Sequence, residues 1–561
     1  MYYLANMRQE FSVSLSATSS ATADGQDTNS ATATALRDND ILLANEDTLF
    51  TLSGNARFTN GLATQQLRTG VTGRAQVFFT NQSAETVIVQ AILINRPGAI
   101  DTVTSQFHPP GTPGMIPWVM GRRSQQTARY TGNPTLLTAL NRMDRTLLNA
   151  HWQYEGESIS VSGAYFIDTK PEKILRVTAG GATARIRPLN VIINDNHFGA
   201  VAACLNNGSV VAWGNAEATV PGAIAGLRDI VTLCATLNAF AGLRQNGGVI
   251  GWGIAGRGGE VPADIGNLRD IISLCACDFA FAAIRQNGGV VAWGSPSEGG
   301  SVPYNISQLR DIVSLRATAN AFSALRQDGS VVAWGTVSGG GIVPPEAEVL
   351  RDIISVSASN LTFTLLRRNG SVLSWGGGQQ LPPEIGALTD IISVVSANYA
   401  FAALRRGGGV VAWGTAQYGG SVPMAIATLR DIIALCGNGG AFAALRQNGS
   451  VVAWGHEYFG GPLPGVIGSL RDIVSLSSTE TAFAALRADG SVAAWGSSFA
   501  GGNPPLNITY LRNIRAIYGG RRSFAALQDD SRVSVWGGGE AAQQANVPAV
   551  LAGNISYTLP V

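Results

Sequence analysis

Side chains that commonly carry acid–base or metal chemistry are few in this sequence and lie far apart. The four histidines are His108, His151, His197 and His456, and no two of them have the spacing of metal ligands. His456 is followed by Glu457, and we interpret this pair as part of a contact loop. Neither a Gly-x-Ser-x-Gly elbow nor a phosphate-binding loop pattern occurs. The sequence therefore predicts no catalytic residue, no metal site, no cofactor and no enzyme activity.

An Arg-Asp pair could form a catalytic dyad if it occurred once, but here it recurs. Arg228-Asp229, Arg310-Asp311 and Arg471-Asp472 stand at equivalent places in the chain. A pair that returns at a fixed interval is typical of a structural contact, and we expect ion pairs between neighbouring repeats.

The five cysteines are also interpreted as structural. Cys234, Cys275 and Cys436 occupy the same place in three repeats, where other repeats carry serine, and the remaining two are Cys204 and Cys277. Such an odd and sparse set does not form a disulfide or zinc framework.

A Trp-Gly pair recurs along the C-terminal two thirds of the chain. The spacings between successive pairs are 39, 41, 41, 41, 38, 41, 41 and 41 residues. A fixed period of about 40 residues indicates a repeat architecture, in which each unit buries its apolar face against its neighbours. We interpret the tryptophans as core wedges: Trp213, Trp252, Trp293, Trp334, Trp375, Trp413, Trp454, Trp495 and Trp536.

One unit, residues 308–346, shows what each repeat forms. Residues 309–315, 321–325 and 329–334 are short runs with the alternation of β-strands, and Asp328-Gly329 is a hairpin signal. Small antiparallel sheets repeated around an axis form a β-propeller. The sequence predicts an all-β fold with about nine three-stranded blades over 187–561, closed by a C-terminal strand that joins the first blade.

The repeat also resembles a known family. Its Phe-x-x-Leu-x-x-Asn-Gly-x-Val-x-x-Trp-Gly pattern is similar to the regulator of chromosome condensation repeat. The short period and the Val-Val-Ala-Trp-Gly motif look most like a bacterial branch of this family that includes a secreted inhibitor of β-lactamases. The resemblance implies a propeller that binds or regulates another protein.

Residues 11–107 are predicted to form a separate β-sandwich after an N-terminal arm, residues 1–10. Several alternating runs are separated by turn signals such as Asp24-Gly25 and Asn60-Gly61. The wording Phe-Thr-Leu-Ser-Gly-Asn-Ala-Arg-Phe-Thr-Asn-Gly, starting at Phe50, resembles the bacterial immunoglobulin-like domain of invasins and intimins. That resemblance implies an adhesin-like or stalk-like module.

Residues 108–186 are predicted to be a connector of mixed structure. Asn133-Pro134 is typical of a helix start, and Leu136, Leu140 and Leu147 follow at one-face helical spacing. We therefore expect one helix over 134–150.

Each blade has three strands that alternate in direction, and we call this alternation chain parity. It places the turns after each first strand and the loops after Trp-Gly on one face of the propeller. These loops vary, whereas the Asn-Gly hairpins of the opposite face are nearly uniform. Variable loops on a rigid scaffold commonly bind partners, and aromatic and arginine side chains are typical anchors. The predicted binding residues are Phe279, Tyr399, Tyr418, His456, Glu457, Tyr458, Phe459, Phe499, Arg521 and Arg522.

Composition limits the class of partner. The net charge is +1, which does not favour nucleic acid as the partner. No apolar run is long enough to span a membrane and the N-terminus lacks the order of a signal peptide, so we expect a soluble protein whose export, if any, uses another route. Two functions stay open: recognition of a protein or glycan, as in a secreted adhesin, toxin or effector, and inhibition or regulation of an enzyme or small GTPase.

Overall fold

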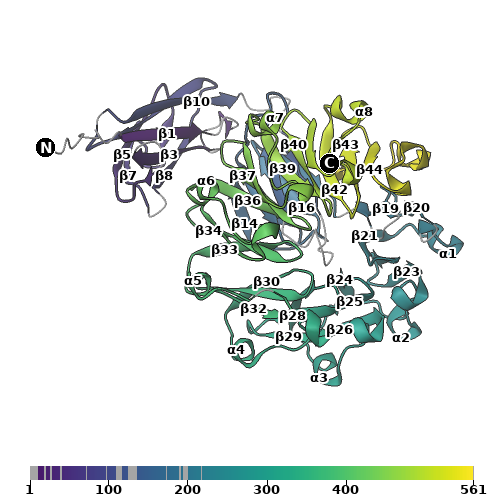
Figure 1. Cartoon of the computed structure of the whole chain (residues 1–561). Coiled ribbons are helices and arrows are strands. Elements are labelled where there is room, and N and C mark those ends of the chain that lie inside the picture. Colours follow the sequence, from purple (N-terminus) through teal and green to yellow (C-terminus); the bar gives the residue numbers. More distant parts are fainter. Residues whose placement is uncertain are drawn as a thin grey trace.

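The computed structural model describes residues 11–559 apart from 18–20, 24, 26–27, 38–40, 71–72, 97, 109–115, 124–134, 172, 189–190, 194–199, 216–217 and 379. The expected arm, residues 1–10, lies outside this part of the chain. Most of the regular structure in it is β-sheet, as the sequence predicts (Figure 1).

Residues 11–108 form two facing five-stranded sheets with one core between them. Val13 and Leu15 point into the core while Ser14 and Ser16 point outward, as strand alternation requires. Phe50, from one sheet, and Phe79, from the other, are fully buried. One sheet contains β1 (Phe11–Ala17), β3 (Asn29–Arg37), β4 (Ile41–Leu42), β6 (Arg57–Phe58) and β8 (Arg74–Thr80). The other contains β2 (Ala21–Thr22), β5 (Asp47–Leu52), β7 (Thr64–Arg68), β9 (Thr86–Leu93) and β10 (Ile100–His108).

The connector is made of strands, and the helix expected over 134–150 is wrong. Residues 135–140 form a fully buried strand that pairs on both sides, and Leu140 bridges Leu147 across a turn. The leucines at helical spacing therefore belong to a strand and the turn that follows it. Neighbouring strands pair with the backbone of residues 135–140, and both faces of this strand are buried. The strands are β11 (Trp118–Met120), β12 (Thr135–Leu140), β13 (Ala150–Tyr154), β14 (Ser160–Gly163), β15 (Tyr165–Asp168), β16 (Leu175–Ala179) and β17 (Ala182–Ile186).

A buried ion pair ties the connector together. Arg123 Nε lies 2.8 Å from Asp168 Oδ2, and both side chains are almost inaccessible to solvent. Arg123 also donates to the backbone carbonyls of Lys170, Lys173 and Arg187 at 3.0, 2.6 and 2.9 Å. A buried charge with this many partners is typical of a structural anchor. Sequence reasoning missed it, because its members lie up to 64 residues apart.

The repeats form nine three-stranded antiparallel sheets among the described residues, consistent with propeller-like blades. In chain order their strands are β18 (Val191–Ile193), β19 (Ala200–Cys204), β20 (Val210–Gly214); β21 (Ile230–Ala235), β22 (Ala239–Arg244), β23 (Val249–Gly253); β24 (Ile271–Ala276), β25 (Ala280–Arg285), β26 (Val290–Gly294); β27 (Ile312–Ala317), β28 (Ala321–Arg326), β29 (Val331–Gly335); β30 (Ile353–Ala358), β31 (Thr362–Arg367), β32 (Val372–Gly376); β33 (Ile391–Ser396), β34 (Ala400–Arg405), β35 (Val410–Gly414); β36 (Ile432–Gly437), β37 (Ala441–Arg446), β38 (Val451–Gly455); β39 (Ile473–Ser478), β40 (Ala482–Arg487), β41 (Val492–Gly496); and β42 (Ile514–Gly519), β43 (Ser523–Gln528), β44 (Val533–Gly537).

Short helical turns connect one sheet to the next. Each connection runs back along the outside of its sheet and contains a one-turn helix that begins after a proline. These helices are α1 (Gly222–Ala225), α2 (Ala263–Gly266), α3 (Tyr304–Ser307), α4 (Pro345–Glu348), α5 (Pro383–Gly386), α6 (Met424–Ala427), α7 (Gly465–Gly468) and α8 (Leu506–Thr509). The 3-10 turns are η2 (Ala255–Arg257), η3 (Pro296–Glu298), η4 (Val337–Gly339), η5 (Ala416–Tyr418), η6 (Glu457–Phe459), η7 (Ser498–Ala500), η8 (Glu540–Ala542), η9 (Gln544–Asn546) and η10 (Ala549–Leu551).

The nine repeat tryptophans are all buried, as predicted. In the fourth sheet, Trp334 stacks on its cross-strand neighbour Phe322 with ring centroids 5.3 Å apart. Its indole Nε1 donates to the carbonyl oxygen of Gly299, in the loop of the preceding sheet, at 2.9 Å. Gly299 has φ +96°, and a Cβ there would lie 2.7 Å from the Phe322 ring. The position therefore suits only glycine.

The same indole–glycine hydrogen bond recurs around the repeats, with two informative exceptions. It is formed by Trp293, Trp334, Trp375, Trp454, Trp495 and Trp536. The buried indole N–H groups of Trp252 and Trp413 have no partner among the described residues. These two follow the short spacings of 39 and 38 residues. Both loops are therefore shorter than those whose glycine supplies the carbonyl acceptor elsewhere.

The recurrent Arg-Asp pairs give the expected ion pair between repeats at Arg351, whose Nε lies 3.5 Å from Oδ2 of Asp328 in the preceding sheet. The aspartates of these pairs form ion pairs within their own sheets. Asp311 pairs with Arg326, at the end of the second strand of its own sheet, with a 2.8 Å Nη2–Oδ2 distance. Arg310 donates to the backbone carbonyls of Ser307 and Leu309 in its own loop. Each pair therefore fixes the start of one sheet.

The first strands of successive sheets contact one another, and β42 of the last sheet contacts β18 of the first. The connector lies against the first strands of the eighth and ninth sheets. Thr138 Oγ1 donates to Val474 O at 2.7 Å, and Arg515 Nε donates to Val119 O at 2.9 Å.

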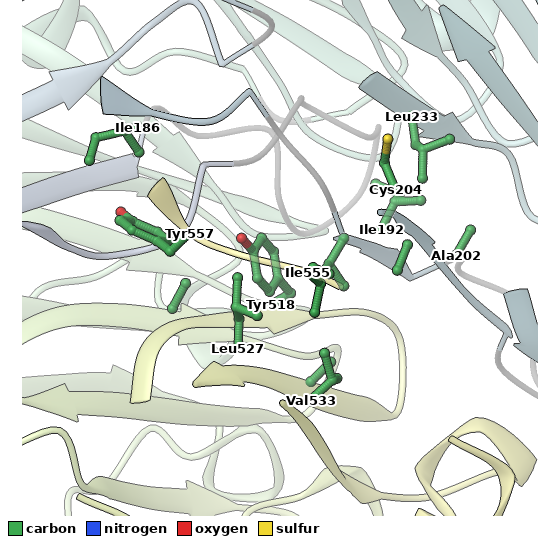
Figure 2. Packing of buried hydrophobic residues seen from close by; sticks show 14 of the residues in the cluster. Ile186, Ile192, Ala202, Cys204, Leu233, Tyr518, Leu527, Val533, Ile555 and Tyr557 are labelled. Atoms are coloured by element: carbon green, nitrogen blue, oxygen red, sulfur yellow. The ribbon is translucent and has the colours of Figure 1, made fainter. Parts of the chain in front are cut away.

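The sequence predicts that a C-terminal strand joins the first sheet, and this prediction is wrong. Instead, β45 (Thr558–Leu559) pairs antiparallel with β17 of the connector. The segment reaches the hairpin of the first sheet, where Asn206 N donates to Asn554 O at 2.7 Å. Ile555 and Tyr557 are buried between the connector, the first sheet and the last sheet (Figure 2).

Replacing Trp334 tests the indole–glycine contact. We expect Trp334→Ala to lower the free energy of unfolding by about 3–5 kcal/mol, because it removes a buried wedge. Trp334→Phe should cost about 1 kcal/mol more than Trp413→Phe, since only the former leaves a buried glycine carbonyl without its donor. Urea unfolding midpoints measure both. Equal losses in the two phenylalanine variants would contradict a stabilising role for the hydrogen bond.

Replacing Ile555 tests the packing of the C-terminal segment. We expect Ile555→Ala to lower the free energy of unfolding by about 2–5 kcal/mol, because the side chain is fully buried where three parts of the chain meet. Val550→Ala is the matched control at a half-exposed position and should cost less than about 0.5 kcal/mol. Similar thermal unfolding curves for both variants would show that this segment does not stabilise the fold.

Candidate binding surface

Five of the predicted binding residues form one aromatic cluster on the loop face. Tyr418 ends η5 after the sixth sheet, and His456, Tyr458 and Phe459 form the corresponding turn after the seventh. Tyr399 comes from the turn between the first two strands of the sixth sheet. The chain parity expected from the sequence thus brings turns from two sheets to one edge.

The rings of the cluster contact one another directly. Tyr418 lies 5.3 Å from Tyr399, 5.8 Å from His456 and 6.0 Å from Phe459, measured between ring centroids. Phe459 lies 5.6 Å from His456 and 5.5 Å from Tyr458. Edge-to-face and offset contacts of this kind contribute about 0.5–1.5 kcal/mol per pair. The rings therefore hold each other in place before any partner binds.

Part of the cluster remains available for contact. Tyr399 and Tyr458 expose 44% and 55% of their surface, while Tyr418, His456 and Phe459 are half-buried. His456 Nδ1 accepts a hydrogen bond from Tyr458 N at 3.1 Å, which caps η6. The neutral imidazole then carries its proton on Nε2. Glu457 is exposed beside these rings and places a negative charge at the rim.

Two glycines form the floor of the cluster, and sequence reasoning missed them. A Cβ at Gly440 would lie 2.7 Å from Tyr418 Cδ1 and 2.8 Å from Phe459 Cδ2. A Cβ at Gly439 would lie 2.6 Å from Phe459 Cε1. The signal was present in the sequence, because Gly439-Gly440 occupies the turn that contains Ala319-Asn320 or Asn398-Tyr399 in other repeats. The pair makes room for the Phe459 ring.

Three of the other predicted binding residues, Phe279, Phe499 and Arg522, take part in two separate cation–π pairs. The Arg522 guanidinium lies 4.9 Å from the Phe499 ring centroid, and Arg521 forms a 2.7 Å ion pair with Glu480. On the other side of the repeats, the Arg257 guanidinium lies 3.9 Å from the Phe279 ring centroid. Among the ring contacts of the described residues, none joins Phe499 or Phe279 to the tyrosine cluster. The predicted loop face therefore carries one aromatic cluster and two separate arginine–aromatic pairs.

The described residues offer little for metal or thiol chemistry. They contain no group of three or more His, Cys, Asp and Glu side chains placed to hold a metal ion. All five cysteines are buried and free, and burial raises the pKa of Cys204 and Cys275 to about 12. Their thiols therefore stay protonated and pack as small side chains. Within the same residues, every helix is too short to cross a membrane.

No family model matches this chain, and no curated protein matches it. Among solved structures it is similar to Prp20p from Saccharomyces cerevisiae, a protein reported with its binding to Gsp1p and histones, at 18% identity over 50% of this chain and 84% of that one, with a TM-score of 0.32. The ectodomain of the Physcomitrella patens receptor kinase CR4 is 20% identical over 48% and 73%, with a TM-score of 0.32. The D00–D0 domain of intimin is 22% identical over 18% and 45%, with a TM-score of 0.13. At these identities and TM-scores, the similar structures give no information about what this protein binds.

Adding a methyl group beneath the rings tests how the cluster is held. We expect Gly440→Ala to displace Tyr418 and Phe459, because its Cβ would meet both rings at under 3 Å. The His456 ring protons, which lie beside Tyr418, should then shift by a few tenths of a ppm in the NMR spectrum. Gly407→Ala is the control, since a Cβ at Gly407 meets nothing within 4 Å. An unchanged His456 signal in Gly440→Ala would show that the rings do not rest on this floor.

Proposed function

We propose that this protein is a non-enzymatic binding protein whose loop face recognises a protein partner. The observation that carries the proposal is the cluster of Tyr399, Tyr418, His456, Tyr458 and Phe459, which presents half-exposed rings on a rigid floor of two glycines. Tyrosine and arginine are typical of residues that dominate the energy of protein interfaces.

The surroundings of the cluster favour a protein over a glycan. Arginine–aromatic pairs lie on other loops of the same face, at Arg522 with Phe499 and at Arg257 with Phe279. Anchors spread across several loops fit the broad contact area of a protein interface. Rings already in contact also lose little side-chain entropy when a partner binds. A glycan remains the alternative outcome of the test.

The proposal includes two finer structural assignments. In it, the nine repeat sheets form one closed nine-bladed propeller, supported by the contact between β42 and β18 and by the burial of Ile555 and Tyr557 at the junction. The two sheets of residues 11–108 form an immunoglobulin-like module of the invasin and intimin type. That resemblance supports a bacterial protein that acts on another cell, as a secreted adhesin, toxin or delivered effector does.

Replacing two exposed rings tests the proposed binding face. We expect Tyr458→Ser with Phe459→Ser to weaken binding of a partner captured by the full chain by about 2 kcal/mol or more, which is roughly thirtyfold in Kd. Gln286→Ala on the opposite, hairpin face is the control and should bind normally. Surface plasmon resonance measures the affinity, and circular dichroism confirms the fold. Equal affinity in both variants would place recognition elsewhere, and capture of glycans alone on an array would replace the protein partner with a glycan.

A further inference from the structure

A cavity of about 420 Å³ lies where the N-terminal sheets meet the seventh repeat sheet. One wall is the outward face of β1, β3 and β8, and the other is the segment after α6 together with the β37–β38 hairpin. Figure 1 shows the N-terminal module beside α6. Sites for small ligands commonly have volumes of about 300–1,000 Å³ and form between domains. The cavity is therefore large enough for a small ligand.

Three polar side chains form a row across the first wall. Ser14 pairs with Thr34, and Thr34 pairs with Arg74, in the register of β1, β3 and β8. Their neighbours Val13 and Leu15 point into the core, so the row faces the cavity. Directly paired positions lie about 5 Å apart. Two hydroxyl groups and a guanidinium thus stand in line at intervals that suit the substituents of a sugar ring.

The charge inside the cavity is positive. Arg74, Arg430 and Arg446 line it together with one acidic residue, Asp431. Arg446 holds both carboxylate oxygens of Asp431 through Nε at 3.0 and 3.1 Å, so this carboxylate is already neutralised. Within the described residues, the lining therefore carries an excess of positive charge that suits an anion.

Arg74 is the side chain least satisfied by the protein. Its buried Nε has no hydrogen-bond partner among the described residues, and its Nη2 makes only a long 3.5 Å contact with Arg430 O. Burial lowers the pKa of Arg74, because desolvation disfavours the charged form. A carboxylate in the cavity would accept from the guanidinium in the paired geometry that arginine favours.

We propose that this cavity binds a small carboxylated saccharide, such as a uronic acid. The carboxylate pairs with Arg74, the sugar hydroxyls bond to Ser14, Thr34 and Asn448, and the ring CH groups lie against Leu36. The site is separate from the proposed protein-binding cluster, because β38 (Val451–Gly455) runs between the Asn448 hairpin and His456. One protein would then carry two recognition sites at opposite ends of the same sheet.

Calorimetric titration of the full chain with glucuronate tests the proposal. We expect saturable binding, at least tenfold weaker binding of glucose and of acetate, and at least a tenfold loss of glucuronate affinity in Arg74→Gln. Thr34→Val, which keeps the charge and the shape, should lose about threefold or more. Arg57→Gln, an exposed arginine of the same module outside the cavity, is the control and should bind as the parent does.

Several outcomes would overturn the proposal. Absence of glucuronate binding, or equal binding by parent and Arg74→Gln, removes the site. Glucose or acetate binding as tightly as glucuronate removes the assignment to a carboxylated sugar. Thermal unfolding distinguishes loss of a ligand contact from loss of the fold: a Thr34→Val variant that melts with the parent yet binds glucuronate equally well excludes the hydroxyl row. These results do not depend on the Tyr458 and Phe459 cluster, so either proposal can fail alone.

Discussion

The repeats depend on one contact between neighbouring sheets, the hydrogen bond from a buried indole to a glycine carbonyl of the preceding loop. That glycine has a positive φ and lies so close to the phenylalanine of the next sheet that no side chain fits, as at Gly299 beside Phe322 and Trp334. The tryptophan thus has two functions: its ring fills the gap between sheets, and its N–H fixes their spacing. Where the glycine loop is shortened, before Trp252 and Trp413, the indole N–H has no acceptor among the described residues, and the contact is made by the ring.

Much of the fold could be predicted from the sequence, because the strands and turns of each repeat are determined by patterns within that repeat. Alternating runs, Asn-Gly turns and a Trp-Gly pair about every 40 residues suffice to predict a three-stranded sheet. The connector could not be predicted in this way. Its Leu136, Leu140 and Leu147 match a helix by spacing. Leu136 and Leu140 nevertheless lie in a strand, which Leu147 bridges, because Val474 and its neighbours supply a surface that no local pattern reveals. The Arg123–Asp168 pair was missed for the same reason.

The candidate binding surface was predicted in part. Chain parity was enough to bring Tyr399, Tyr418 and Phe459 to one edge, because strand direction is fixed once three strands per unit are known. Strand direction does not tell how far apart two loops lie along that edge. It therefore could not predict that Phe499 contacts Arg522 rather than the rings of the tyrosine cluster. The glycine floor depends on which side chain leans over it, and that follows from packing rather than from strand order.

The packing of the connector against the last sheet has a consequence for how the chain folds. Gly121 accepts from the hydroxyl of Tyr557, and Val119 accepts from Arg515, so contacts that complete the core join residues 436 and 396 positions apart. Each sheet, by contrast, joins residues within one repeat and can form early. Because contacts between distant residues slow folding, the rate-limiting step is expected to be the meeting of the two ends of the array rather than the formation of any sheet. Until that step, the inner surface of the connector stays exposed to other chains, and the dilute conditions that suppress aggregation should raise the yield of refolding.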